Sequence, residues 1–279
     1  MLHVENMLAA DFPFAVKLAN TMDWNMNQED FKLNLKLERE GCFVLFDRID
    51  RAGIATCISF ERVGWFGNLV VDEDRRNQGG GTILVQKAIS YLRHKGVETI
   101  GLYAYQHLVR FYENIGFKSN QEFSVFQGKT DSHCIKSKLE RITEKDVPEV
   151  TGFDKECFRG NRRKLLKPIC LNENNQCYLA KHKGKITGYI MAKNYDKMIE
   201  VGPLICRRES NDVAKSLLGT VLSNSMGREV FVCLPTENNP LIGLLAEMGL
   251  KERFRVTRMF LGPAVAESCT YIAESLERG

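Results

Sequence analysis

The sequence predicts an α/β fold built from two successive copies of a mixed central sheet flanked by helices. Apolar strand-like runs alternate with helical segments in the first half. The second half repeats this plan at a nearly constant displacement, with Asp11-Phe12-Pro13 recurring as Asp146-Val147-Pro148, Gly53-Ile54 as Gly188-Tyr189, Leu69-Val70 near Pro203-Leu204, and Gly116-Phe117 as Gly249-Leu250. Four ordered matches favour a tandem duplication, and 279 residues are enough for two domains.

Spacing of apolar residues gives the elements in order. In the first half we expect helices over 11–24, 29–40, 82–95 and 109–114, and strands over 42–46, 54–60, 67–71, 97–104 and 122–127. In the second half we expect helices over 146–157, 211–226 and 240–248, and strands over 177–181, 186–192, 199–205, 229–233 and 255–261. Gly41 and Gly96 end two of the helices. The polar segment 128–138 lacks periodicity, so the expected domains are 1–130 and 138–279.

Composition restricts the class of function. A net charge of +4 is too small to indicate nucleic acid as the main partner. No apolar run approaches the ~18 residues of a membrane span, and the N-terminus lacks a secretory signal pattern. The nine cysteines are scattered, which predicts reduced thiols and a cytoplasmic protein. The five histidines are dispersed, so no metal site is expected. Nothing in the pattern specifies an oligomeric state.

The most informative segment joins a buried strand to a helix. It runs Leu69-Val70-Val71-Asp72-Glu73-Asp74-Arg75-Arg76-Asn77-Gln78-Gly79-Gly80-Gly81-Thr82. Glycines allow backbone amides to converge at the start of a helix, where free N–H groups and the helix dipole favour an anion such as a pyrophosphate. A plain glycine turn before a helix would look the same.

Two other phosphate-binding patterns fit poorly. A dinucleotide fingerprint would need glycine where Leu84 stands. Gly128-Lys129-Thr130 resembles the end of a nucleotide-binding P-loop, but Phe123 occupies the place of that loop's first glycine.

Two motifs resemble a known family. Arg76-Asn77-Gln78-Gly79-Gly80-Gly81 matches the Arg/Gln-x-x-Gly-x-Gly/Ala signature of the GNAT superfamily of acyl-CoA-dependent N-acyltransferases, and Phe111-Tyr112-Glu113-Asn114-Ile115-Gly116-Phe117 is similar to its downstream Phe-Tyr-x-x-x-Gly-Phe element. The resemblance covers most of residues 1–128. The whole chain resembles a tandem subgroup in which an active first GNAT domain precedes a degenerate second one.

The resemblance implies a site. Two parallel strands would separate, and the pantetheine arm of acetyl-CoA would bind the backbone of Leu69 and Val71 on the first of them. The pyrophosphate would bind the amides of Arg76, Asn77, Gln78, Gly79, Gly80, Gly81 and Thr82. A substrate amine would attack the thioester directly, a backbone N–H near Val71 would polarise its carbonyl, and Tyr112 would protonate the leaving thiolate. A core aromatic is the alternative interpretation of Tyr112.

The general base is not fixed by the sequence. Asp72, Glu61 and His107 are candidates, although each is also typical of a solvated surface position. The family's usual Asn-x-x-Ala before the tyrosine is absent, because Tyr105 and Leu108 occupy those positions, which leaves one cofactor contact open.

The second half keeps the predicted order of strands and helices but lacks the glycine loop and the tyrosine. Cys206–Asp212 stands in place of the glycine loop and contains no glycine, and Leu245 replaces the tyrosine, while Asn238 retains the asparagine. We expect no pyrophosphate binding there, and a domain that completes the substrate pocket or forms an interface. The basic run Phe158–Lys164 favours a solvated helix start over a clamp for an acidic group.

These patterns predict an N-acetyltransferase that uses acetyl-CoA and a small-molecule primary amine. The alternatives are an acyl-CoA-binding sensor without turnover and a partner-binding protein whose glycine loop is only a turn. The sequence does not identify the amine or the preferred acyl chain.

Overall fold

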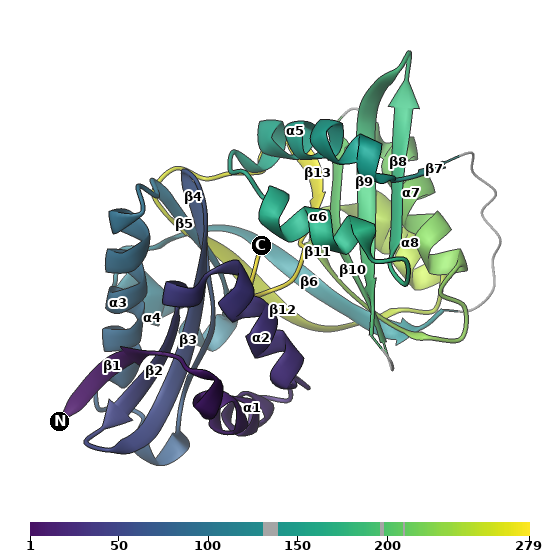
Figure 1. The fold of residues 1–279 in the computed structure, drawn as a ribbon. Helices are drawn as coiled ribbons and strands as arrows, with labels where there is room; N and C mark the ends of the chain where they lie inside the picture. Colours follow the sequence, from purple (N-terminus) through teal and green to yellow (C-terminus); the bar gives the residue numbers. More distant parts are fainter. Residues whose placement is uncertain (131–138, 196–197, 209) are drawn as a thin grey trace.

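The structure is a computed structural model that describes residues 1–130, 139–195, 198–208 and 210–279. Residues 131–138 of the expected interdomain segment lie outside the described residues. One mixed sheet of thirteen described strands runs through the molecule, and helices flank it in both halves (Figure 1). This architecture confirms the expected α/β class.

The elements of each half follow the same order. The first half contains β1 (Leu2–Asn6), α1 (Phe12–Asn20), α2 (Gln28–Leu37), β2 (Cys42–Asp47), β3 (Asp50–Phe60), β4 (Val63–Val71), α3 (Gly80–His94), β5 (Thr99–Tyr105), α4 (Val109–Glu113) and β6 (Lys118–Lys129). The second contains β7 (Glu140–Arg141), α5 (Val147–Phe158), α6 (Arg163–Leu171), β8 (Gln176–His182), β9 (Lys185–Asn194), β10 (Met198–Arg207), α7 (Asn211–Ser223), β11 (Glu229–Pro235), α8 (Asn239–Glu247), β12 (Lys251–Leu261) and β13 (Cys269–Ile272).

The two halves exchange their long strands. The sheet order is β1-β2-β3-β4-β5-β12-β6-β11-β10-β9-β8-β7, with β13 paired to β10. Strand β6 therefore lies between β12 and β11, both from the second half, and β12 lies between β5 and β6, both from the first (Figure 1). The chain-order division into 1–130 and 138–279 stays a proposal, and in space each part includes a strand from the other.

The helices cover both faces of the sheet. In the first half α3 and α4 pack on one face, and α1 and α2 pack on the other. In the second half α7 and α8 lie on one face, and α5 and α6 on the other. The largest buried cluster joins the halves, with Trp65 and Phe60 of the first half in ring contact with Phe158 and Phe260 of the second. The halves therefore share one core.

Local sequence explains most helix ends. Proline occupies the first turn of both α1 and α5, where its missing N–H costs no hydrogen bond. The expected helix over 11–24 is shorter, because α1 ends at Asn20 and Asp23 adopts a positive φ of 57° that a continuing helix excludes. Apolar periodicity did not predict β1, α6, β7 or β13, and β4 begins at Val63 rather than at Gly67.

Candidate active site

Strands β4 and β5 separate soon after they meet. They pair in parallel only where Val63–Trp65 lies beside Thr99–Gly101. A bulge then interrupts the pairing of β4 with β3, at Asn68, whose φ is 51°. Beyond Gly101, β5 keeps only its pairing with β12 on its other edge, which runs from Ile100 to Tyr105. Among the described strands, none pairs with this edge of β4 from Phe66 to Val71, which is the gap expected from the sequence.

Two predicted cofactor contacts, Leu69 and Val71, lie on this open stretch of β4. Leu69 has no register partner on β3 among the described residues. The carbonyl oxygen of Val71 accepts a hydrogen bond from Nε of Arg76 at 3.1 Å, and no described strand pairs with Val71 on the β5 side. Because buried backbone groups need partners, this edge is suited to pair with an extended ligand.

The glycine loop forms the start of α3. Asn77 and Gly79 have positive φ values of 62° and 85°, and the helix begins at Gly80. The first amide of α3 with a backbone acceptor is that of Ile83, which donates to Gly79 O at 3.1 Å. The amides from Gly80 to Thr82 therefore have no backbone partner among the described residues. Free amides at a helix N-terminus form the anion cradle that the sequence predicts.

Tyr112 lies on the α3 side of the sheet, beside the point where the strands part. It contacts the ring of Phe66, the first β4 residue beyond the parallel pairing, with centroids 6.4 Å apart, and it packs between Phe111 and Phe117. Its side chain is buried, its hydroxyl has no hydrogen bond to any described residue, and burial raises its pKa. The hydroxyl therefore stays protonated near neutral pH.

The three candidate bases lie in different places. Glu61 sits in the turn before β4, at the opposite end of that strand from Val71, and its carboxylate pairs with Lys155 at 2.7 Å. The side chain of Asp72 accepts from the amide of Asp74 at 3.2 Å, so it caps a short turn. His107 stacks on Tyr105 at the end of β5. Glu61 is therefore too remote to act at the gap.

The last residues of the described chain pack against the opposite face of β4. Trp65 donates from Nε1 to the carbonyl of Leu276 at 3.4 Å. A Cβ atom on Gly67 would lie 2.6 Å from the Cα of Glu277, so only glycine permits this close approach. Because Phe66 points to Tyr112 and its neighbours Trp65 and Gly67 point to this segment, the gap lies between Tyr112 and residues 276–279.

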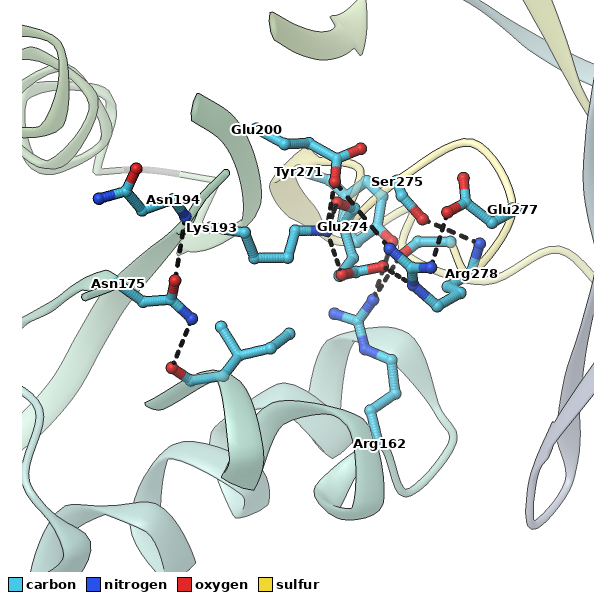
Figure 2. Close-up of polar contacts among 12 residues, drawn as sticks. Arg162, Asn175, Lys193, Asn194, Glu200, Tyr271, Glu274, Ser275, Glu277 and Arg278 are labelled. Atoms are coloured by element: carbon cyan, nitrogen blue, oxygen red, sulfur yellow. Dashed lines mark hydrogen bonds and ion pairs between the residues drawn. The ribbon is translucent and has the colours of Figure 1, made fainter. Parts of the chain in front are cut away.

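A buried charge network holds this segment in place (Figure 2). Lys193 of β9 pairs with Glu274 and, at 2.7 Å, with Glu200 of β10. Arg278 donates to Glu274 at 3.0 Å and lies 2.7 Å from Glu277. Burial would raise the pKa of Glu274, but Arg278 and Lys193 outweigh burial and lower it to about 2. Glu277 keeps a side-chain exposure of 21%, whereas Glu274 has none.

Asp30 of α2 faces the same charges from the first half. Burial raises the pKa of its carboxyl, and the nearby negative charge of Glu277 raises it further, against a hydrogen bond from the amide of Asn27 that lowers it. Sequence analysis selected neither Asp30 nor Glu277, because no local motif surrounds them.

In the basic run Phe158–Lys164, α6 begins at Arg163 and the side chains of Arg159, Arg163 and Lys164 are exposed, as expected for a solvated helix start, but Arg162 is not. Arg162 is fully buried and forms a two-pronged ion pair with Asp154, at 2.6 and 3.1 Å. It also donates to the carbonyl of Gly279 at 2.7 Å and to Tyr271 at 3.2 Å (Figure 2). Arg162 therefore anchors the residues that cover β4, a structural role that lies deep in the interface.

In the second half the corresponding gap is filled. Strands β10 and β11 pair in parallel at Met198–Val201 and then separate. Strand β13 pairs with β10 along Leu204–Arg207, and Ala273 donates to the carbonyl of Cys233 on β11 at 3.0 Å. Leu245 is buried in the core at the tyrosine position, and Asn238 caps α8. The protein's own strand thus occupies the edge that a pantetheine arm would need.

Comparisons with known proteins identify the family. The acetyltransferase (GNAT) family profile matches residues 3–117, and an acetyltransferase (GNAT) domain profile matches residues 150–272. The chain belongs to the GNAT superfamily. It is a tandem of two GNAT domains and an acyltransferase of that type. YitH, an uncharacterized N-acetyltransferase of Bacillus subtilis, is 24% identical over 242 residues, which are 84% of this chain and 82% of that protein.

Solved structures share the fold across both halves. A protein from Pyrococcus horikoshii proposed to be an acetyltransferase aligns with a TM-score of 0.82 at 18% identity, covering 100% of this chain and 96% of that one. A GCN5-related N-acetyltransferase from Sphaerobacter thermophilus aligns with a TM-score of 0.69 at 15% identity, covering 96% and 98%. A tandem GNAT protein from the clavulanic acid biosynthesis pathway gives 0.63 at 14% identity, covering 95% and 100%.

Within residues 1–130, 139–195, 198–208 and 210–279, no three His, Cys, Asp or Glu side chains are grouped so that they could hold a metal ion. In the same ranges no helix combines the length and the apolar character of a membrane span.

Glu274→Gln tests the network that holds residues 274–279. Since the folded pKa of Glu274 is depressed, its stabilising effect is present above its ordinary pKa of 4.5 and is lost as pH falls from there toward 2. We expect the variant to lose about 3–5 kcal/mol of unfolding free energy at pH 7. Urea unfolding should show the difference shrinking below pH 4.5. Glu247→Gln, at an exposed position, serves as control; equal losses in both variants would contradict the assignment.

Proposed function

We propose that the first half transfers an acetyl group from acetyl-CoA to a primary amine of a small molecule. The observation that carries this proposal is the unpaired edge of β4 at Leu69–Val71, which runs directly into the free amides that begin α3. Family membership supports acyl transfer, and the choice of acetyl-CoA and of an amine is our own. We also propose a cytoplasmic location, because the cysteines that the structure describes are unpaired.

The chain's own groups fit acetyl-CoA. The backbone of Leu69 and Val71 would hold the pantetheine arm as an added strand. The amides from Asn77 to Thr82 would hold the pyrophosphate, because they lie at the positive end of a helix of fifteen residues and have no backbone acceptor among the described residues. The amide of Arg76, which the sequence also predicted as a contact, donates instead to the carbonyl of Glu73 at 3.3 Å. No side chain at Gly79 or Gly81 closes the approach, since a Cβ atom on Gly79 would meet nothing within 4 Å and one on Gly81 only the ring of Phe111, at 3.5 Å.

Acetyl-CoA supplies a thioester that a neutral amine can attack directly. An N–H of the open β4 edge would polarise the carbonyl oxygen as negative charge develops there. Tyr112 holds its proton because burial raises its pKa, and it stands beside the parting of the strands without a competing hydrogen-bond acceptor among the described residues. The hydroxyl would donate that proton to the sulfur as the C–S bond breaks.

The amine would approach from the face covered by residues 276–279. Glu277 contacts Gly67 of β4, and Asp30 of α2 lies close enough to Glu277 for the negative charge of Glu277 to raise its pKa. Carboxylates on both sides suit a positively charged amine before reaction. The raised pKa of Asp30 makes it a better proton acceptor than an ordinary aspartate. On this proposal the second half completes the acceptor site.

Gly81→Asp tests the cofactor position. Aspartate in the first turn of a helix is compatible with folding, but its charge would repel a pyrophosphate. By isothermal titration we expect the parent to bind acetyl-CoA in the micromolar range at one site per chain, and the variant to lose that binding. Gly152→Asp, at an exposed helical position with nothing within 4 Å of an added Cβ, is the matched control. Failure of the parent to bind would overturn the proposal.

Tyr112→Phe separates an enzyme from a sensor. The change removes only the hydroxyl from an aromatic cluster, so the fold and acetyl-CoA affinity should hold. We expect kcat to fall by about 100-fold or more, measured as thiol release with an amine panel. Turnover equal to that of the parent would exclude Tyr112 as the proton donor, and a parent that binds acetyl-CoA without turnover would favour the sensor.

Glu277→Gln tests the acceptor face. Loss of one carboxylate should raise KM for the amine by about tenfold and leave KM for acetyl-CoA unchanged, because charge-assisted hydrogen bonds are worth roughly 1.5–3 kcal/mol. Steady-state kinetics with each substrate varied in turn gives both constants. Glu247→Gln is the control, and a parallel rise in both KM values would show a general structural effect instead.

A further inference from the structure

A cavity of about 600 Å³ opens where β10 and β11 have separated. Strand β13 fills the inner part of that separation, and the cavity lies at its mouth. Its wall includes Thr270 and Tyr271 of β13 together with Asn120 of β6 and Arg258 of β12. The volume suits a small metabolite.

Arg258 brings an uncompensated charge to this cavity. Its side chain is only 2% exposed. Its Nε donates a hydrogen bond to Asn120 Oδ1 at 2.9 Å, and the side chain has no carboxylate partner within the described part of the chain. The guanidinium rests on the rings of Phe123, 4.9 Å to the centroid, and Tyr271, 5.8 Å. A buried cation without an ion-pair partner is costly, so an anion in the cavity would supply what the protein lacks.

The start of α7 adds to the positive potential. Asn211, its first residue, lines the cavity, and the helix has thirteen residues. The first amide of α7 with a backbone acceptor is that of Ala214, which donates to Ser210 O at 3.1 Å. The amides of Asn211, Asp212 and Val213 have no backbone acceptor among the described residues, and helix N-termini of this kind favour anions. Arg208, also in the wall, has no ion-pair partner among the described residues.

Three carboxylates lie at the rim. Glu122 accepts from Gln106 at 2.9 Å, Glu267 accepts from Asn120 at 3.0 Å, and Glu237 accepts from Gln121 at 3.5 Å. All three residues are exposed, so solvent screens their charges. Arg258 lies buried, where the same charge acts more strongly.

We propose that this cavity binds a small metabolite through an oxyanion, a carboxylate or a phosphate, held by Arg258 with Arg208 and the α7 amides. The site stands apart from the gap at β4 and does not depend on the proposed function. Strand β13 occupies the β10 edge that a pantetheine arm would use, so the ligand is a compact anion rather than CoA. On this proposal the second domain binds a small anion at the place where the first domain would bind its cofactor.

The test uses the full chain carrying Gly81→Asp, so that the amides of α3 do not compete for the probe. Inorganic phosphate and succinate are titrated separately, each followed by thermal unfolding at constant ionic strength and by the Arg side-chain Nε–H signals in NMR. We expect Tm to rise with one or both anions and one buried arginine signal to shift. A response to phosphate alone or to succinate alone identifies the oxyanion.

Three variants locate the site. Arg258→Gln should abolish the rise in Tm, and the exposed Arg208→Gln, which cannot disturb the core, should raise the apparent Kd by about tenfold. Arg253→Gln changes an exposed arginine of the same strand outside the cavity and should behave as the parent. The proposal fails if neither anion stabilises the protein, or if Arg208→Gln and Arg253→Gln respond alike.

Discussion

When two parallel strands separate, their backbone amides and carbonyls lose each other as hydrogen-bond partners and need new ones. Such a separation occurs at the same place in both halves. In the first half β4 parts from β5 after Trp65, and the bulge at Asn68 turns the freed edge toward the start of α3. In the second half β10 parts from β11 after Val201, and β13 takes the freed edge. One half is therefore open to a ligand and the other is complete by itself.

Filling the second gap has a consequence for the first. Residues that follow β13 continue through Glu274 to Gly279 and reach β4, where Glu277 packs on Gly67. Strand β13 fills the gap between β10 and β11, and the residues that follow it cover the face of β4 that we propose for the acceptor. Arg162, Lys193 and Arg278 fix this course, because each is buried and each needs the acidic or carbonyl partner that the segment brings. On the proposed function, the filled strand edge in one domain and the acceptor site of the other are therefore parts of one arrangement.

Features encoded by a few neighbouring residues could be predicted from the sequence. The strand, the glycine turn and the helix start between Leu69 and Thr82 follow from local backbone preferences, and the structure places them as a free edge, positive-φ positions and open amides. Tyr112 was selected by its motif, and the structure adds that its side chain is buried and that its ring contacts Phe66 beside the gap. The chemical roles of these residues stay predictions until they are measured.

Features that depend on distant partners could not be predicted. Apolar runs predicted the interiors of β6 and β12, but such a run does not show which strand it pairs with. The exchange of β6 and β12 between the halves could therefore not be predicted. Strand β13 is four residues long with no alternation to reveal it. In the basic run, Arg162 and Lys164 look equivalent, yet one is fully buried against Asp154 and the other reaches Glu38 near the surface. The two residues differ because Arg162 meets an aspartate eight residues earlier and a glycine carbonyl more than one hundred residues later, and only the folded chain brings these groups together.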